Sequence, residues 1–114
     1  MSHLTILPTV LRDSACLEAV LLARGLQPRR GGSLPSFPPE RQPVELSVRL
    51  SDDLQLGWQR QPDGSLGLVC DLQRLSRGRR LERLLGEITR AYAARMALAE
   101  AAAFLPTAQI ELGA

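Results

Sequence analysis

The sequence predicts a single α+β domain in which a mainly antiparallel sheet of four to five strands carries two helices packed on one face. Three observations predict this fold class. Apolar and polar residues alternate in three successive runs over residues 44–72. Apolar residues recur at helical spacing over 79–104, and a strand-like stretch followed by a helix-like stretch occupies residues 3–25. A sheet covered by helices on one face buries all of these apolar stripes together.

The composition fits one globular domain spanning residues 1–114. A chain of 114 residues has the usual length of one domain. Hydrophobic residues make up 45% of it and charged residues 23%, which is not the balance of a disordered chain. Aromatic residues are only 4%, so we expect an aliphatic core.

Charge and cysteine content exclude several classes of protein. The formal net charge of +2 is too small to indicate nucleic-acid binding by itself. Cys16 and Cys70 are too few for a disulfide scaffold or a closed zinc site. No apolar run is long enough to cross a membrane, and the N-terminus lacks the features of a signal peptide. We therefore expect a cytoplasmic protein.

The first two elements follow one another closely. Residues 3–11 are rich in aliphatic and β-branched types and are predicted to form a strand, with Pro8 favouring an edge position or a bulge. Asp13 or Ser14 then supplies an N-cap for a helix. Gly25 is placed to end that helix.

Residues 27–43 hold five of the eight prolines. Such a density predicts a loop, because proline lacks the N–H that a strand or helix needs. Phe37 could anchor this loop to the body of the protein.

The clearest pattern is a predicted three-stranded meander. Its alternating apolar positions are Val44, Leu46, Val48 and Leu50, then Leu54, Leu56 and Trp58, then Leu66, Leu68, Cys70 and Leu72. Asp63-Gly64 marks the second turn, because Gly accepts a positive φ. Alternation of this kind predicts antiparallel strands with one buried face, on which Trp58 and Cys70 lie.

A long helix is predicted over 79–104. Leu81, Leu84, Leu85, Ile88 and Tyr92 share one helical face. Gly86 lowers helix propensity and could mark close packing. Residues 91–103 are alanine-rich, which suits either an exposed helix or a contact surface of a homo-oligomer. Residues 108–112 alternate again and are predicted to add a last strand.

Several of these segments resemble one known family. The matching features are Ser2-His3 before a Thr/Ile strand and Asp13, the triplet Leu56-Gly57-Trp58, the turn Asp63-Gly64-Ser65, the run Leu68-Val69-Cys70-Asp71, and helix residues Leu84-Leu85, Ile88-Thr89-Arg90 and Tyr92-Ala93. In this order they resemble the family called hypothetical chloroplast reading frame 35, which occurs in cyanobacteria, some plastids and other bacteria. The resemblance covers residues 1–26 and 54–100.

The chain also departs from that family. Its proline-rich loop has no counterpart there. It has Leu54-Gln55 where the family has an aromatic and an acidic residue, and its last strand is shortened. The resemblance implies a cyanobacterial or plastid protein, located in the cytosol or the stroma and serving the photosynthetic apparatus. It implies no settled biochemical activity.

The candidates for chemistry are few. His3 is the only histidine, and Asp71 lies near a strand end on the face opposite the aliphatic stripe. Together they could form a small metal site or catalytic site, but a structural histidine and a solvated or capping carboxylate are the more common explanation of such residues. No serine elbow or phosphate-binding loop is present. We therefore predict no catalytic residues, no cofactor and no resident metal, and we favour a non-catalytic function.

An arginine cluster is the most informative feature. Its members are Arg74, Arg77, Arg79, Arg80 and Arg83. Cations at a helix N-terminus oppose the helix dipole, so such a cluster can mark a site for an acidic partner. It can also be a solvated turn balanced by Glu82 and Glu87. No aromatic residues interleave with these arginines, which makes RNA or DNA a weaker alternative.

The sequence therefore predicts a small accessory protein that docks to a protein partner, with an acidic surface on the partner. The expected contact residues are the arginine cluster together with Ser2, His3 and Asp71. The alternatives are a nucleic-acid-binding module and a small metal protein or enzyme that uses His3 and Asp71.

Overall fold

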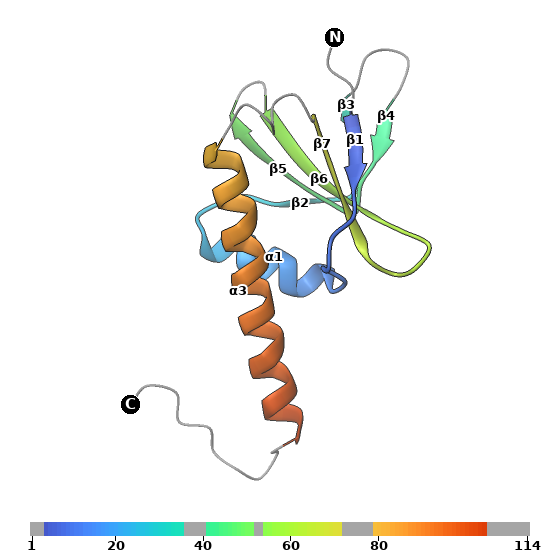
Figure 1. Ribbon diagram of the computed structural model, residues 1–114. Helices are drawn as coiled ribbons and strands as arrows, with labels where there is room; N and C mark the ends of the chain where they lie inside the picture. The colour runs from blue at the N-terminus through green and yellow to red at the C-terminus, as the bar shows by residue number, and fades with distance from the viewer. Residues whose placement is uncertain (1–3, 36–40, 52–53, 72–78, 105–114) are drawn as a thin grey trace.

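The central sheet has five strands in the order β1-β7-β6-β5-β2. A computed structural model describes residues 4–35, 41–51, 54–71 and 79–104 of the chain (Figure 1). The strands of the sheet are β1 Leu4–Leu7, β2 Arg29–Arg30, β5 Leu46–Ser51, β6 Leu54–Arg60 and β7 Leu66–Asp71. Every neighbouring pair is antiparallel. The predicted α+β class and the antiparallel meander are confirmed.

Strand β1 is an edge strand, as Pro8 indicates. It is shorter than predicted, because the described strand ends at Leu7 instead of continuing to Leu11. Beyond it, the Thr9 hydroxyl donates to the Leu66 carbonyl at 2.5 Å, so the chain leaves the sheet while still tied to β7.

Helix α1, Ser14–Ala23, begins and ends where the sequence predicts. The Asp13 carboxylate accepts a hydrogen bond from the Cys16 backbone N–H at 3.0 Å, which satisfies one of the donors left open at a helix start. At the other end Gly25 has a φ of +80°, and the Leu26 N–H donates to the Leu21 carbonyl at 3.0 Å. This is a Schellman motif, in which glycine adopts the left-handed conformation at little cost.

Helix α3, Arg79–Phe104, has the predicted bounds. Its buried face, which includes Leu81, Ile88 and Tyr92, packs with α1 and with the inward residues of β5, β6 and β7 in one apolar cluster. Figure 1 shows both helices on the same side of the sheet, with the second half of α3 extending past α1. The prediction of two helices on one face is confirmed.

The proline-rich segment corrects the prediction of a loop. Its described residues include β2, then β3 Ser33–Pro35 and β4 Arg41–Pro43, which pair with each other as a second, two-stranded sheet. Gly31 and Gly32 between β2 and β3 both have positive φ, at +74° and +84°. These glycines allow the reversal, and proline is tolerated because both strands of a two-stranded sheet are edges.

The central sheet buries parts of both faces, which corrects the prediction of one buried face. Leu34, Val44 and Val69 form a second apolar cluster. Gly57 faces this cluster, and a Cβ there would lie 2.6 Å from Val44 Cγ1. The small hairpin therefore covers part of the outer face, and it can approach closely because Gly57 has no side chain.

Val44 itself lies in that second cluster rather than beside Leu46 in the main one. Strand β5 begins at Leu46; before it, the Val44 N–H donates to the Gly32 carbonyl, whereas the Glu45 N–H donates to the Trp58 carbonyl of β6. Trp58 and Cys70 are fully buried in the main cluster, as predicted. The predicted last strand at 108–112 and the Phe37 anchor lie outside the described residues.

Candidate functional site

The described part of the arginine cluster is the exposed start of α3. Arg79, Arg80 and Arg83 lie in the first two turns and are all exposed; we name these three residues the basic helix start. The helix places them by its own geometry, because Leu81 turns inward to the core and its neighbours in sequence turn outward. Arg74 and Arg77 lie outside the described residues.

The basic helix start takes no part in the ion pairs found among described residues. Those pairs are Arg24–Glu87, Arg30–Glu18 at 2.9 Å and Arg60–Glu45 at 2.6 Å. The sequence suggested that Glu82 and Glu87 balance the arginines. The structure corrects this for Glu87, whose carboxylate pairs with Arg24 at the end of α1 and ties the two helices together. Glu82 remains as the acidic residue of the first turn of α3.

Of the other predicted contact residues, Asp71 is the last residue of β7 and is half-buried. It lies opposite Leu4 of β1 in the strand register. Ser2 and His3 lie outside the described residues. Within residues 4–35, 41–51, 54–71 and 79–104, no group of three His, Cys, Asp or Glu side chains is arranged to hold a metal ion.

The two cysteines are held as thiols. Burial raises the pKa of the Cys70 thiol, and the Asp71 carboxylate adds to this shift. Burial also raises the pKa of Cys16, whose Sγ lies 4.0 Å from the Tyr92 carbonyl oxygen. Neither is favoured as a thiolate nucleophile.

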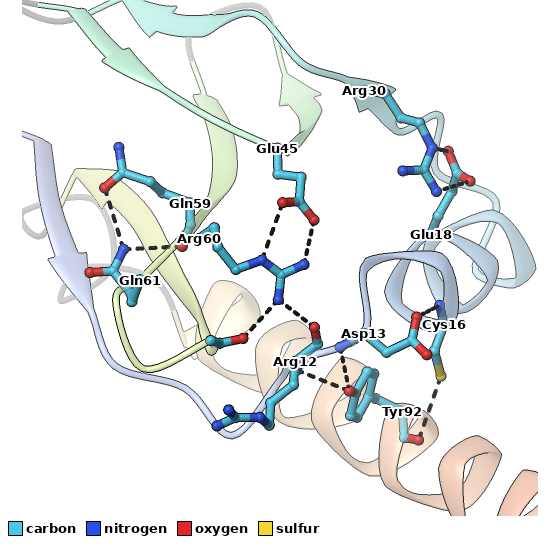
Figure 2. Close-up of polar contacts among 11 residues, drawn as sticks. Arg12, Asp13, Cys16, Glu18, Arg30, Glu45, Gln59, Arg60, Gln61 and Tyr92 are labelled. Carbon is cyan, nitrogen blue, oxygen red and sulfur yellow. Dashed lines mark hydrogen bonds and ion pairs between the residues drawn. The ribbon is translucent and has the colours of Figure 1, made fainter.

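Sequence reasoning missed the polar role of Tyr92. Its phenolic oxygen accepts hydrogen bonds from the backbone N–H groups of Arg12 and Asp13, at 3.0 and 2.8 Å (Figure 2). The ring lies in the core while the oxygen meets the chain entering α1. The periodicity of α3 places the ring correctly but carries no signal for these two bonds.

Arg60 was also missed, and it connects three segments at once. Its Nε and Nη2 donate to the Glu45 carboxylate at 3.2 and 2.6 Å. Its Nη1 donates to the carbonyl oxygens of Arg12 and Gly64, at 2.6 and 2.7 Å. Figure 2 shows Arg60 between Glu45 and Arg12. The planar, multidentate guanidinium suits such a hub, whereas a lysine could not replace it.

The described surface includes a shallow hollow and a groove. The hollow, of about 550 Å³, lies open to solvent beside this network and is lined in part by Val10, Arg12, Tyr92 and Met96. A groove of about 800 Å³ lies along β2 and β5, and its lining includes Arg29 and Arg49. Both volumes are in the range of sites that bind ligands or short peptide segments.

The alanine-rich half of α3 is largely exposed. From Ala93 to Phe104 each side chain is exposed except Met96 and Ala101, which are half-buried. Leu98 is 46% exposed and Phe104 is 84% exposed. Among the described residues, these two apolar side chains are therefore available for a contact.

No helix in the described residues has the length and apolar character that crossing a membrane requires. A family model described as "Protein of unknown function (DUF1257)" matches residues 21–107, a range that begins within α1 and includes all of α3. No curated protein and no solved structure matches the chain.

Proposed function

The chain belongs to the DUF1257 family of proteins of unknown function, and on that premise we propose that it is a small accessory protein that docks to an acidic surface of a protein partner. The observation that carries this proposal is the state of its arginines. Arg24, Arg30 and Arg60 form ion pairs within the fold, whereas the basic helix start is exposed and absent from those pairs.

Electrostatics supports a docking role for this surface. Cations at a helix N-terminus oppose the helix dipole and repel one another, so three exposed arginines there cost stability. An acidic partner would reverse both effects by supplying carboxylates to the arginines and negative charge to the helix N-terminus. Arg74 and Arg77, which precede α3 in the sequence, are proposed as further contacts, as are Ser2, His3 and Asp71.

The finer part of the proposal rests on the resemblance to the chloroplast reading frame 35 family. In this part we propose that the protein serves the photosynthetic apparatus in a cyanobacterial cytosol or a plastid stroma. A homo-oligomeric contact through residues 91–103 is a further proposal, and the exposed Leu98 supports it.

Affinity capture tests the docking role. The tagged protein is used to capture partners from a cyanobacterial lysate, with and without nuclease, beside the variants Arg79→Glu/Arg80→Glu and Arg90→Glu/Arg95→Glu. The second variant makes the same charge change at two exposed arginines further along α3. We expect a nuclease-resistant protein partner that the first variant loses by about tenfold and the second retains.

Other outcomes contradict the proposal. Capture that nuclease abolishes would indicate RNA or DNA binding, whose affinity falls steeply with salt. Equal loss in both variants would mean that net charge matters and the basic helix start does not. An empty capture would contradict a stable complex and direct attention to His3 and Asp71.

A further inference from the structure

The outer edge of β5 is only partly covered. The register pairs Arg29 with Ser47 and Arg30 with Leu46, so β2 covers two residues of β5. Strand β5 continues to Ser51, and among the described residues no strand pairs with its outer edge at Val48–Leu50. A strand edge of this kind presents backbone N–H and C=O groups to an added strand.

Strand β2 begins at Arg29, directly after Pro28. The chain from Gly25 to Pro28 is returning from the end of α1, so it passes the edge of β5 without pairing to it.

The groove of about 800 Å³ lies at this place. The α1–β2 connection lines one part of it, and Ser47, Val48 and Arg49 of β5 line another. Space is therefore present where β2, if it were longer, would continue along β5. An extended segment is the shape that such a position accepts.

The charge of the groove favours an acidic occupant. Arg29 lies opposite Ser47, and Arg49 follows Ser47 by two residues, so both arginines occupy the same face of the sheet. Both are exposed, and neither belongs to the ion pairs found among described residues. Arg30, by contrast, is held by Glu18. The side chains of Arg29 and Arg49 therefore lie on the same face of the sheet and both line the groove.

The residues that line the groove also favour a peptide over a nucleic acid as its ligand. None of the described residues that line the groove is aromatic, so bases would find no side chain on which to stack. Gln55, which lies opposite Arg49 in the register, instead offers an amide that can bond a peptide backbone or a carboxylate.

We propose that this groove binds an acidic, extended segment of a partner protein, which adds a strand along β5 beyond β2 and places carboxylates on Arg29 and Arg49. The backbone of the segment supplies the hydrogen bonds of strand addition, and its charge supplies selectivity. This inference does not depend on docking at the basic helix start, because the two surfaces use different arginines.

The test uses a fluorescein-labelled peptide of about eight residues that alternates Glu and Thr, which combines negative charge with a preference for extended structure. Fluorescence anisotropy measures its binding to the wild-type protein. Three comparisons accompany it: the same peptide with alternate backbone amides N-methylated, a peptide that alternates Lys and Thr, and the protein variant Arg29→Glu/Arg49→Glu. The variant Arg90→Glu/Arg95→Glu controls for net charge.

We expect binding that weakens about tenfold or more in the groove variant and with the N-methylated peptide, while the charge control retains it. Amide shifts in the NMR spectrum of the wild-type protein should then centre on Ser47–Leu50 and Arg29, a result that needs no variant. No binding at about 1 mM peptide would overturn the proposal. So would equal binding of the N-methylated peptide, equal loss in the charge control, or shifts centred on Arg79–Arg83. The last result would support the basic helix start while refuting the groove.

Discussion

Tyr92 couples the start of α1 to the middle of α3 through two hydrogen bonds on one oxygen. Its side chain is only 6% exposed, and its oxygen accepts hydrogen bonds from the backbone N–H groups of Arg12 and Asp13. Each such hydrogen bond contributes about 0.5–1.5 kcal/mol to stability.

The variant Tyr92→Phe isolates that effect, since the ring and its packing are retained. We expect the free energy of unfolding to fall by about 1–3 kcal/mol, measured by urea denaturation. The matched control is Thr89→Val, in which an exposed side chain on the same helix loses its bond to the Leu85 carbonyl. A Tyr92→Phe variant as stable as the wild type would show that the two bonds contribute nothing.

Two carboxylates give the fold a dependence on acid. A hydrogen bond from Arg60 holds the pKa of Glu45 below its ordinary value of 4.5, with help from Ser14. Hydrogen bonds from the side chain and backbone of Ser65 hold the pKa of Asp63 below 3.8. Because both pKa values are lower in the folded state, their contribution is present above the unfolded values. It is lost as the pH falls through the folded values.

We therefore expect Glu45→Gln/Asp63→Asn to be less stable than the wild type at about pH 6 and to approach it at about pH 3. Thermal unfolding across this range measures the difference. Glu100→Gln, at an exposed position of α3, should follow the wild type at every pH. If the double variant loses as much stability on acidification as the wild type, the two carboxylates are not the cause.

At the scale of single residues, local features could be predicted from the sequence, whereas long-range contacts could not. The cap at Asp13, the stop at Gly25 and the buried Trp58 follow from local rules, because each depends on neighbours close in the sequence. The bonds of Arg60 and Tyr92 join residues 48 and 80 positions away. No periodicity or motif reports such contacts, so they were found only in the structure.

At the scale of elements, α3 has an electrostatically unfavourable N-terminus, and the apolar packing of the residues that follow stabilises the helix. The basic helix start opposes the helix dipole, while the stripe of Leu81, Ile88 and Tyr92 holds the helix against the sheet and α1. Gly86 was expected to mark close packing. A Cβ there would meet only the Arg90 guanidinium, at 3.4 Å, so the structure does not support that explanation.

This arrangement predicts that Arg79→Glu/Arg80→Glu stabilises the isolated protein. Each change replaces an unfavourable charge at the helix N-terminus by a favourable one, worth about 0.3–1 kcal/mol in low salt. Urea denaturation in low salt should show the gain, and about 1 M salt should remove most of it. Arg90→Glu/Arg95→Glu, away from the helix start, should show no comparable gain. A loss of stability in the first variant would mean that the arginines support the fold.

The small hairpin of β3 and β4 shows a limit of composition rules at this scale. Prolines in 27–43 predict irregular structure, yet β3 and β4 pair in the register Ser33↔Pro43 and Pro35↔Arg41. Proline is excluded from positions whose N–H must bond a neighbour, and a two-stranded sheet leaves half of those groups facing outward. The long-range contact of Leu34 and Val44 with Val69 then stabilises the hairpin against the main sheet.

For the whole molecule, the fold separates a structural side from two candidate binding surfaces. The helices cover one face of the sheet, and the ion pair Arg24–Glu87 joins the end of α1 to α3. The basic helix start and the β2–β5 groove both lie outside this packing, each with exposed arginines. The fold class and most element bounds could be predicted because they follow from periodicity. The groove could not, because it arises from how a short strand ends beside a longer one.

Site-directed photocrosslinking in the lysate tests the central claim, that the basic helix start is the docking surface. A benzophenone amino acid replaces Glu82, which lies between the arginines of the basic helix start, Leu98 on the alanine-rich half of α3, or Gln27 at the groove; all three positions are exposed. The docking account predicts a protein adduct from position 82 that disappears when Arg79→Glu/Arg80→Glu is added. A product of the chain with itself from position 98 would support the homo-oligomer. No adduct from position 82, or one that the double variant leaves unchanged, would contradict docking at the basic helix start.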